Sequence, residues 1–169
     1  SCCAVERIYV MRSIYPRFVD AYVAEVEKYR IGHPEDESTT IGPLAQAKAV
    51  DFLEFQVRQA VGQGARVLTG GKRLPGPGYW FQPTVLVDVN HGMSLMMEES
   101  FGPVIGIMPV DSEDQAVRLM NDSPYGLTAS IWTEDPRRGE ALAHRTNAGT
   151  VYVNRCDYLD PELAWVGIK

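Results

Sequence analysis

Apolar residues recur along the chain at two spacings, and the first is the three- to four-residue period of a helix with one buried face. This period predicts four helices of ordinary length. Proline near one expected start and an Asp-Pro pair at another support them, because proline is well tolerated in the first helical turn. A shorter helix is expected over 94–99. The longer helices are expected from Pro16 to near Ile31-Gly32 with Val19, Val23 and Val26 buried; through Val50, Leu53, Val57 and Val61 to Gly62-Gln63-Gly64; from Glu113 with Ala116, Val117 and Met120 inward; and from Pro136 to Gly149.

The second spacing is a short run of β-branched and other apolar residues, which is typical of strands. Val104–Val110 is almost wholly apolar, so it is expected to be buried on both faces. The other strands are expected at Arg7–Val10, Val67-Leu68, Val85–Val87, Leu127–Trp132 and Thr150–Val153. Strands alternating with helices predict an α/β fold, with a mostly parallel sheet and helices on both faces. No internal repeat or low-complexity linker divides the sequence, so we expect residues 1–169 to form one domain.

Composition narrows the class of protein. Apolar residues make up 45% of the 169 residues and charged residues 22%, which is typical of a globular domain. The net charge of −6 argues against a nucleic-acid backbone or an anionic membrane surface as the partner. No run approaches the roughly 20 apolar residues of a membrane span.

The cysteines and histidines carry little sign of a metal site or a disulfide framework. Cys2 and Cys3 are adjacent and Cys156 is distant, which predicts free thiols and a reducing compartment such as the cytoplasm. No zinc-ligand spacing is present, and no metal is expected. The three histidines, His33, His91 and His144, are isolated and are expected at the surface or in loops.

Two segments could carry chemistry. In the first, Cys2 precedes a strand, where a thiol is either a small core residue or a nucleophile. In the second, Glu98-Glu99-Ser100-Phe101-Gly102-Pro103 places two carboxylates before an aromatic ring and a turn. This is either a helix end with solvated glutamates, or a carboxylate that grips vicinal ribose hydroxyls beside an apolar wall.

Taken together, the motifs resemble one family. They are Ile41-Gly42-Pro43-Leu44, Gly78-Tyr79 with Pro83-Thr84-Val85, Glu98–Pro103, Tyr125-Gly126-Leu127 and Gly149-Thr150-Val151-Tyr152-Val153-Asn154. In this order they resemble the cysteine-bearing catalytic half of an NAD(P)-dependent aldehyde dehydrogenase, along essentially the whole chain.

The resemblance implies a role for three residues. Cys2 would be the nucleophile that forms a thiohemiacetal and then a thioester with the aldehyde, while Cys3 would be a bystander. Glu99 would hold the nicotinamide ribose, and Phe101 would line the nicotinamide pocket. The cofactor would be NAD or NADP, and the complete enzyme would be a homo-oligomer, either a dimer or a tetramer.

The chain also departs from the family pattern. The family's catalytic glutamate, its asparagine oxyanion donor and its nucleotide-binding domain precede the nucleophile, so we expect a chain truncated at both ends and inactive alone. Many relatives read Pro-aromatic-Gly-Gly-x-Lys near the end, where this chain has Ala164–Lys169. Trp165 is there a candidate for either the aldehyde pocket or plain packing.

Two alternatives remain open. The first is a non-catalytic module that keeps the fold for subunit assembly. The second is a cysteine hydrolase that pairs Cys2 with His33, His91 or His144 as base.

Overall fold

The computed structural model describes residues 1–156 and 160–169, which divide into two compact units. The four-strand unit is Val5–Pro109. The two-strand unit combines Ser1–Ala4 with Val110–Lys169. The prediction that residues 1–169 form one domain stays a prediction.

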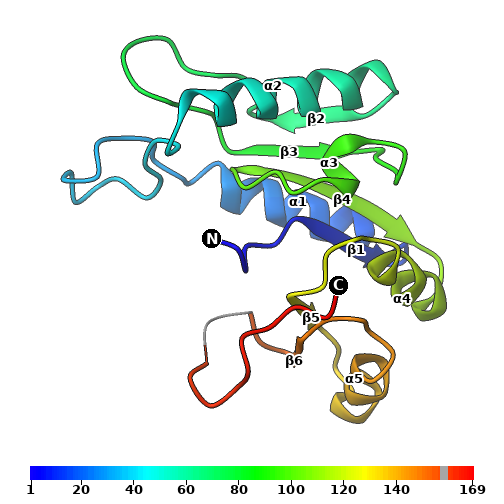
Figure 1. The fold of residues 1–169 in the computed structure, drawn as a ribbon. Helices are drawn as coiled ribbons and strands as arrows, with labels where there is room; N and C mark the ends of the chain where they lie inside the picture. The colour runs from blue at the N-terminus through cyan, green and yellow to red at the C-terminus, as the bar shows by residue number, and fades with distance from the viewer. Residues whose placement is uncertain (157–159) are drawn as a thin grey trace. The chain divides into compact units, whose positions relative to one another are not determined.

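The four-strand unit is built on one sheet with the strand order β1-β4-β3-β2 (Figure 1). Strands β3 and β4 pair in parallel, with Val85 opposite Ile105, whereas β2 and β3 pair antiparallel. Its elements are β1 (Arg7–Met11), α1 (Tyr15–Val26), α2 (Ala47–Gly62), β2 (Arg66–Thr69), β3 (Thr84–Val87), α3 (Ser94–Met97) and β4 (Val104–Val110).

The sheet is therefore mixed, because β2 runs antiparallel to its neighbour β3 while β3 and β4 are parallel as predicted. The connection between β2 and β3 contains no helix, and a parallel neighbour would need a crossover of a dozen or more residues, usually helical. Instead, residues 70–83 fold back as a long hairpin. Gly70, Gly71, Gly76 and Gly78 have positive φ there, and Arg73 forms an antiparallel bridge with Phe81.

Helices cover both faces of this sheet, as predicted. Alternate residues of β3 point to opposite faces, because side chains alternate along a strand. Leu86 packs with α2 and α3 on one face, in a cluster that includes Leu53 and Met96. Val85 and Val87 pack with α1 on the other face, against Val19.

The two-strand unit contains a parallel pair joined by a helical crossover. Strand β5 (Thr128–Ile131) pairs with β6 (Thr150–Val153), with Ala129 opposite Val151. Helix α5 (Pro136–Ala143) connects them and contacts both strands. Helix α4 (Glu113–Asn121) precedes β5 and is capped by Ser112, whose side chain accepts a hydrogen bond from the Gln115 backbone N–H.

Four details of the helix predictions are wrong. The short helix α3 ends at Met97 and not at Glu99, because Glu98 has extended backbone. Helix α1 ends at Val26, because the chain then turns and Ile31 forms a parallel bridge with Ile41. Val61 is 48% exposed, so it lies off the buried stripe of α2. Helix α5 ends at Ala143, well before Gly149, and tight turns follow that place the Asn147 backbone N–H on the side chain of Asn121.

Candidate active site

Cys2 lies on a tight turn just before β1. The Ala4 backbone N–H donates to the Ser1 carbonyl oxygen at 3.0 Å, so Cys2 and Cys3 are the two central residues of this turn. Cys2 is exposed, whereas Cys3 is half-buried with its Sγ 3.1 Å from the Ser1 Oγ. All three cysteines are free. A thiol at the tip of a turn is open to reagents, which a small core residue would not be.

The segment 98–103 connects α3 to β4 and is anchored at each end. At its start, the Glu98 backbone N–H donates to the Ser94 carbonyl at 2.7 Å. At its end, the Pro103 carbonyl accepts from the Thr84 backbone N–H at 2.8 Å. A Cβ on Gly102 would lie 2.5 Å from Leu53 Cδ1, so only glycine lets the segment pass this closely over α2.

The middle of the segment is held by Glu6. Its Oε2 accepts a hydrogen bond from the Ser100 backbone N–H at 3.0 Å, and its Oε1 accepts from the Phe101 N–H at 3.1 Å. Phe101 has φ 47°, a left-handed conformation that costs a bulky residue on the order of 1–3 kcal/mol. Hydrogen bonds to a charged group contribute ~1.5–3 kcal/mol each, so the Glu6 carboxylate can offset that cost.

The side chains of Glu99 and Phe101 are exposed on this anchored backbone. Glu99 is exposed, and within residues 1–156 and 160–169 its carboxylate has no hydrogen-bond or ion-pair partner. Phe101 is 53% exposed. Glu99 offers an unengaged carboxylate and Phe101 an exposed ring, which are the chemical groups that a ribose and the apolar face of a nicotinamide require.

The motifs Tyr125-Gly126-Leu127 and Gly149–Asn154 lie side by side in the two-strand unit. The Gly149 backbone N–H donates to the Gly126 carbonyl oxygen at 2.9 Å, and the Thr150 backbone N–H donates to the Leu127 carbonyl oxygen at 3.1 Å. The end of the chain joins them, since the Ile168 N–H also donates to the Gly126 carbonyl. Trp165, in this last segment, is half-buried, which is compatible with either role considered for it.

The histidines are spread over the two units. His91 lies 2.7 Å from the Tyr9 hydroxyl through its Nε2, so that nitrogen is already engaged. His33 is exposed beside Glu35, and His144 is exposed at the end of α5. Within the described residues, the His33 ring pairs with Glu35 alone and His144 has no hydrogen-bond or ion-pair partner for its ring, so neither is fixed in the way that a catalytic base is fixed. In the described part of the chain, no group of three or more His, Cys, Asp or Glu could hold a metal ion.

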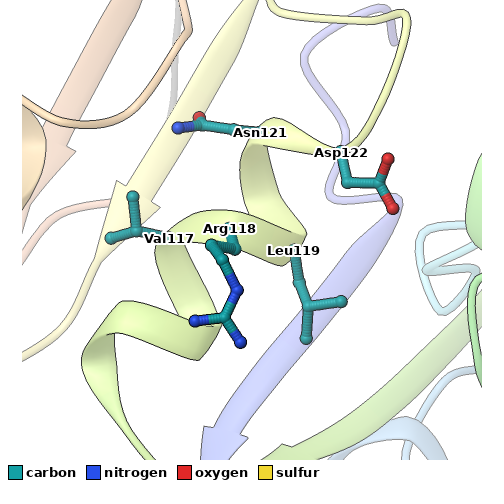
Figure 2. A pocket seen from close by; sticks show the side chains of 5 residues that line it. All are labelled: Val117, Arg118, Leu119, Asn121 and Asp122. Carbon is teal, nitrogen blue, oxygen red and sulfur yellow. The ribbon is translucent and has the colours of Figure 1, made fainter.

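A shallow depression of about 550 Å³ lies at the end of α4, lined by Val117, Arg118, Leu119, Asn121 and Asp122. Figure 2 shows that these five side chains spread in different directions. Binding sites place a few polar groups so that they converge on the ligand. This depression therefore has no sign of a site.

Comparison with known proteins shows the family. The model of the aldehyde dehydrogenase family matches residues 1–169, and the chain belongs to that family. It is 37% identical over 169 residues to a succinate-semialdehyde dehydrogenase [NADP(+)] of Mycobacterium avium, covering 100% of this chain and 36% of that protein. The chain thus spans about a third of the length of the curated relatives it matches.

Solved structures agree. Lactaldehyde dehydrogenase from Escherichia coli superposes with a TM-score of 0.97 at 36% identity, over 100% of this chain and 36% of that one. An NAD⁺ complex of an aldehyde dehydrogenase from Bacillus cereus has a TM-score of 0.95 at 34% identity, over 100% of this chain and 34% of that one. The relatives therefore include proteins named for NADP⁺ and proteins bound to NAD⁺.

The structure thus places two of the three predicted site residues, Glu99 and Phe101, on one segment of the four-strand unit, while Cys2 belongs to the two-strand unit. Nothing in the sequence pointed to Glu6, which holds this segment. A glutamate directly before a strand gives no sign that its partners lie 94 and 95 residues further along the chain.

The helices in the described part of the chain are too short or too polar to span a membrane.

Proposed function

We propose that this chain carries the nucleophile-bearing part of an NAD(P)-dependent aldehyde dehydrogenase, which oxidises an aldehyde to a carboxylic acid. The observation that carries the proposal is the family match over residues 1–169, which includes Cys2 and the whole segment 98–103. Assembly of the complete enzyme into a homo-oligomer is part of the same proposal, and light scattering tests it.

Cys2 acts as the nucleophile. Its thiolate attacks the aldehyde carbon, which forms a C–S bond and places a negative charge on the former carbonyl oxygen. The Cys2 backbone N–H is a hydrogen-bond donor for that oxyanion, because donors aimed at developing charge lower the barrier. Cys2 Sγ holds the carbon from which a hydride must leave, and a bound nicotinamide cofactor would supply the hydride acceptor. The resulting thioester on Cys2 is hydrolysed by water, which releases the carboxylic acid and restores the thiol.

Glu99 and Phe101 hold the cofactor in place for this transfer. The Glu99 carboxylate accepts hydrogen bonds from the ribose hydroxyls, and the Phe101 ring provides an apolar wall that excludes water. Precise placement matters because a displacement of about 1 Å at a reacting centre can cost about 10²-fold in rate.

The test compares Cys2→Ala with Cys3→Ala in the complete enzyme, by following the absorbance of reduced cofactor with a panel of aldehydes. Cys2→Ala is expected to lose at least about 10³-fold in rate, because no other step replaces the covalent one. Cys3→Ala is the matched control, and it is expected to keep most of the activity. An active Cys2→Ala enzyme beside an inactive Cys3→Ala enzyme would move the nucleophile to Cys3, and activity in both would refute the covalent mechanism.

A further inference from the structure

Two consecutive charged residues at the start of β1 hold the connection between α3 and β4. Glu6 accepts from the backbone N–H groups of Ser100 and Phe101, as described above. Next to it, Arg7 Nη1 donates to the Met96 carbonyl oxygen at 3.0 Å. The Glu6 carboxylate thus accepts hydrogen bonds from two N–H groups, and the Arg7 guanidinium donates to a carbonyl near the end of α3. Each charge therefore has a partner of complementary polarity.

We propose that Glu6 is a positioning residue for cofactor binding, an inference that rests on the proposed function. Its carboxylate fixes the backbone of Ser100 and Phe101, and this backbone sets the directions of the Glu99 and Phe101 side chains. Glu6 itself contacts neither the aldehyde nor the cofactor in this role.

The contacts around the segment support a positioning role. Of the described side chains, that of Glu6 alone bonds to the Ser100 and Phe101 amides. The other anchors lie outside this stretch, at the Glu98 N–H and the Pro103 carbonyl. Without Glu6, no described side chain holds the backbone N–H groups of Ser100 and Phe101, so the strained φ of Phe101 can relax. Because Glu99 and Phe101 are both exposed, the directions of their side chains depend on the backbone that carries them.

The experiment measures cofactor binding and turnover for Glu6→Ala and Glu6→Gln in the complete enzyme, with NAD⁺ and NADP⁺ as probes. Glu6→Ala is expected to raise the KM and the Kd of the cofactor about tenfold or more, the equivalent of one lost charge-assisted hydrogen bond. Glu6→Gln keeps one acceptor oxygen, so a smaller increase is expected. The alkylation rate of Cys2 is expected to stay unchanged in both. Glu27→Gln, which removes an exposed carboxylate of the same unit, is the matched control.

Amide hydrogen exchange provides a readout that a general loss of stability would not reproduce. In Glu6→Gln, exchange at Ser100 and Phe101 is expected to accelerate selectively, while amides of β3 and β4 keep their protection. Uniform acceleration across the four-strand unit, or cofactor constants equal to those of Glu27→Gln, would overturn the positioning role. If Glu6→Ala fails to fold, Glu6→Gln alone decides.

The unaltered enzyme separates the two claims. If it oxidises aldehydes while the Glu6 variants bind cofactor normally, only the positioning role is refuted. If it neither binds NAD⁺ or NADP⁺ nor oxidises any aldehyde of the panel, the proposed function is refuted and the positioning role falls with it.

Discussion

Phe101 is the residue whose backbone is hardest to explain by packing alone. Two other non-glycine residues with positive φ are Asp88 and Asn154, which are types that enter the left-handed region with little penalty. Phe101 is bulky and 53% exposed, so burial compensates only part of the strain. Strained backbone persists where surrounding contacts over-determine it, and it clusters at functional sites. The strain at Phe101 therefore supports a binding role for this segment.

Glu99→Gln is expected to slow hydride transfer more than the preceding addition of the Cys2 thiol to the aldehyde, because the proposed role of Glu99 is to orient the cofactor ribose. Replacing the carboxylate with an amide loses a charge-assisted hydrogen bond of ~1.5–3 kcal/mol, which corresponds to a decrease of roughly 10- to 100-fold. Stopped-flow measurement of the first turnover of reduced cofactor checks this. An unchanged hydride step would remove Glu99 from the site and make Glu98 the candidate.

Among the secondary-structure elements, the hairpin between β2 and β3 depends on a close approach of two backbones. Gly70 has φ 73°, and a Cβ there would collide with the Pro83 carbonyl oxygen. Thr84 strengthens the same junction, since its Oγ1 accepts from the Gly71 backbone N–H at 2.8 Å. Glycine at position 70 is thus required both for its backbone conformation and for lack of space.

Gly70→Ala is therefore expected to lower the free energy of unfolding by at least about 2 kcal/mol, from left-handed strain and overpacking together. Gly62→Ala is the matched control. Gly62 is the last residue of α2, a Cβ there would meet nothing within 4 Å, and alanine favours a helix by up to about 1 kcal/mol. Urea denaturation of the chain measures both variants. Equal midpoints would show that the hairpin tolerates a side chain at position 70.

The accuracy of the sequence predictions also differed between elements. Every expected strand and helix forms, because the apolar periods of segments such as Val104–Val110 depend only on neighbouring residues. The local pattern could not show that β2 is antiparallel to β3. The apolar pair Val67-Leu68 predicts a strand, but not the direction of that strand relative to its neighbour. The local pattern also could not predict that α5 ends at Ala143. The turns after α5 are held by a hydrogen bond from the Asn147 backbone N–H to the side chain of Asn121, which belongs to helix α4. Glu99 and Phe101 could be selected because they belong to a short local motif. Glu6 could not, because its hydrogen-bond partners are distant in sequence.

Across the whole molecule, acidic side chains outnumber basic ones, and several are held ionised by hydrogen bonds. Arg145 donates to Asp114 at 2.6 Å, and this hydrogen bond lowers the pKa of Asp114. In the four-strand unit, the hydrogen bond from Arg73 lowers the pKa of Glu54. The backbone N–H of Ser38 lowers the pKa of Asp36 in the same way. Each unit therefore contains at least one carboxylate that is more acidic in the folded chain than in the unfolded one.

These shifts predict that acid destabilises the fold. A carboxyl whose pKa is lower in the folded state contributes stability above its unfolded pKa, near pH 4, and loses it as the pH falls through the folded value. The midpoint of urea denaturation is thus expected to be flat near neutral pH and to decrease from about pH 5 downward. Asp114→Asn removes one such group, so its curve should decrease less steeply in acid than that of the unaltered chain. Asp20→Asn is the control, because Asp20 is exposed and has no ion pair among the described residues. If Asp114→Asn and Asp20→Asn follow the same pH curve, the pair of Asp114 and Arg145 contributes nothing to the stability of the two-strand unit.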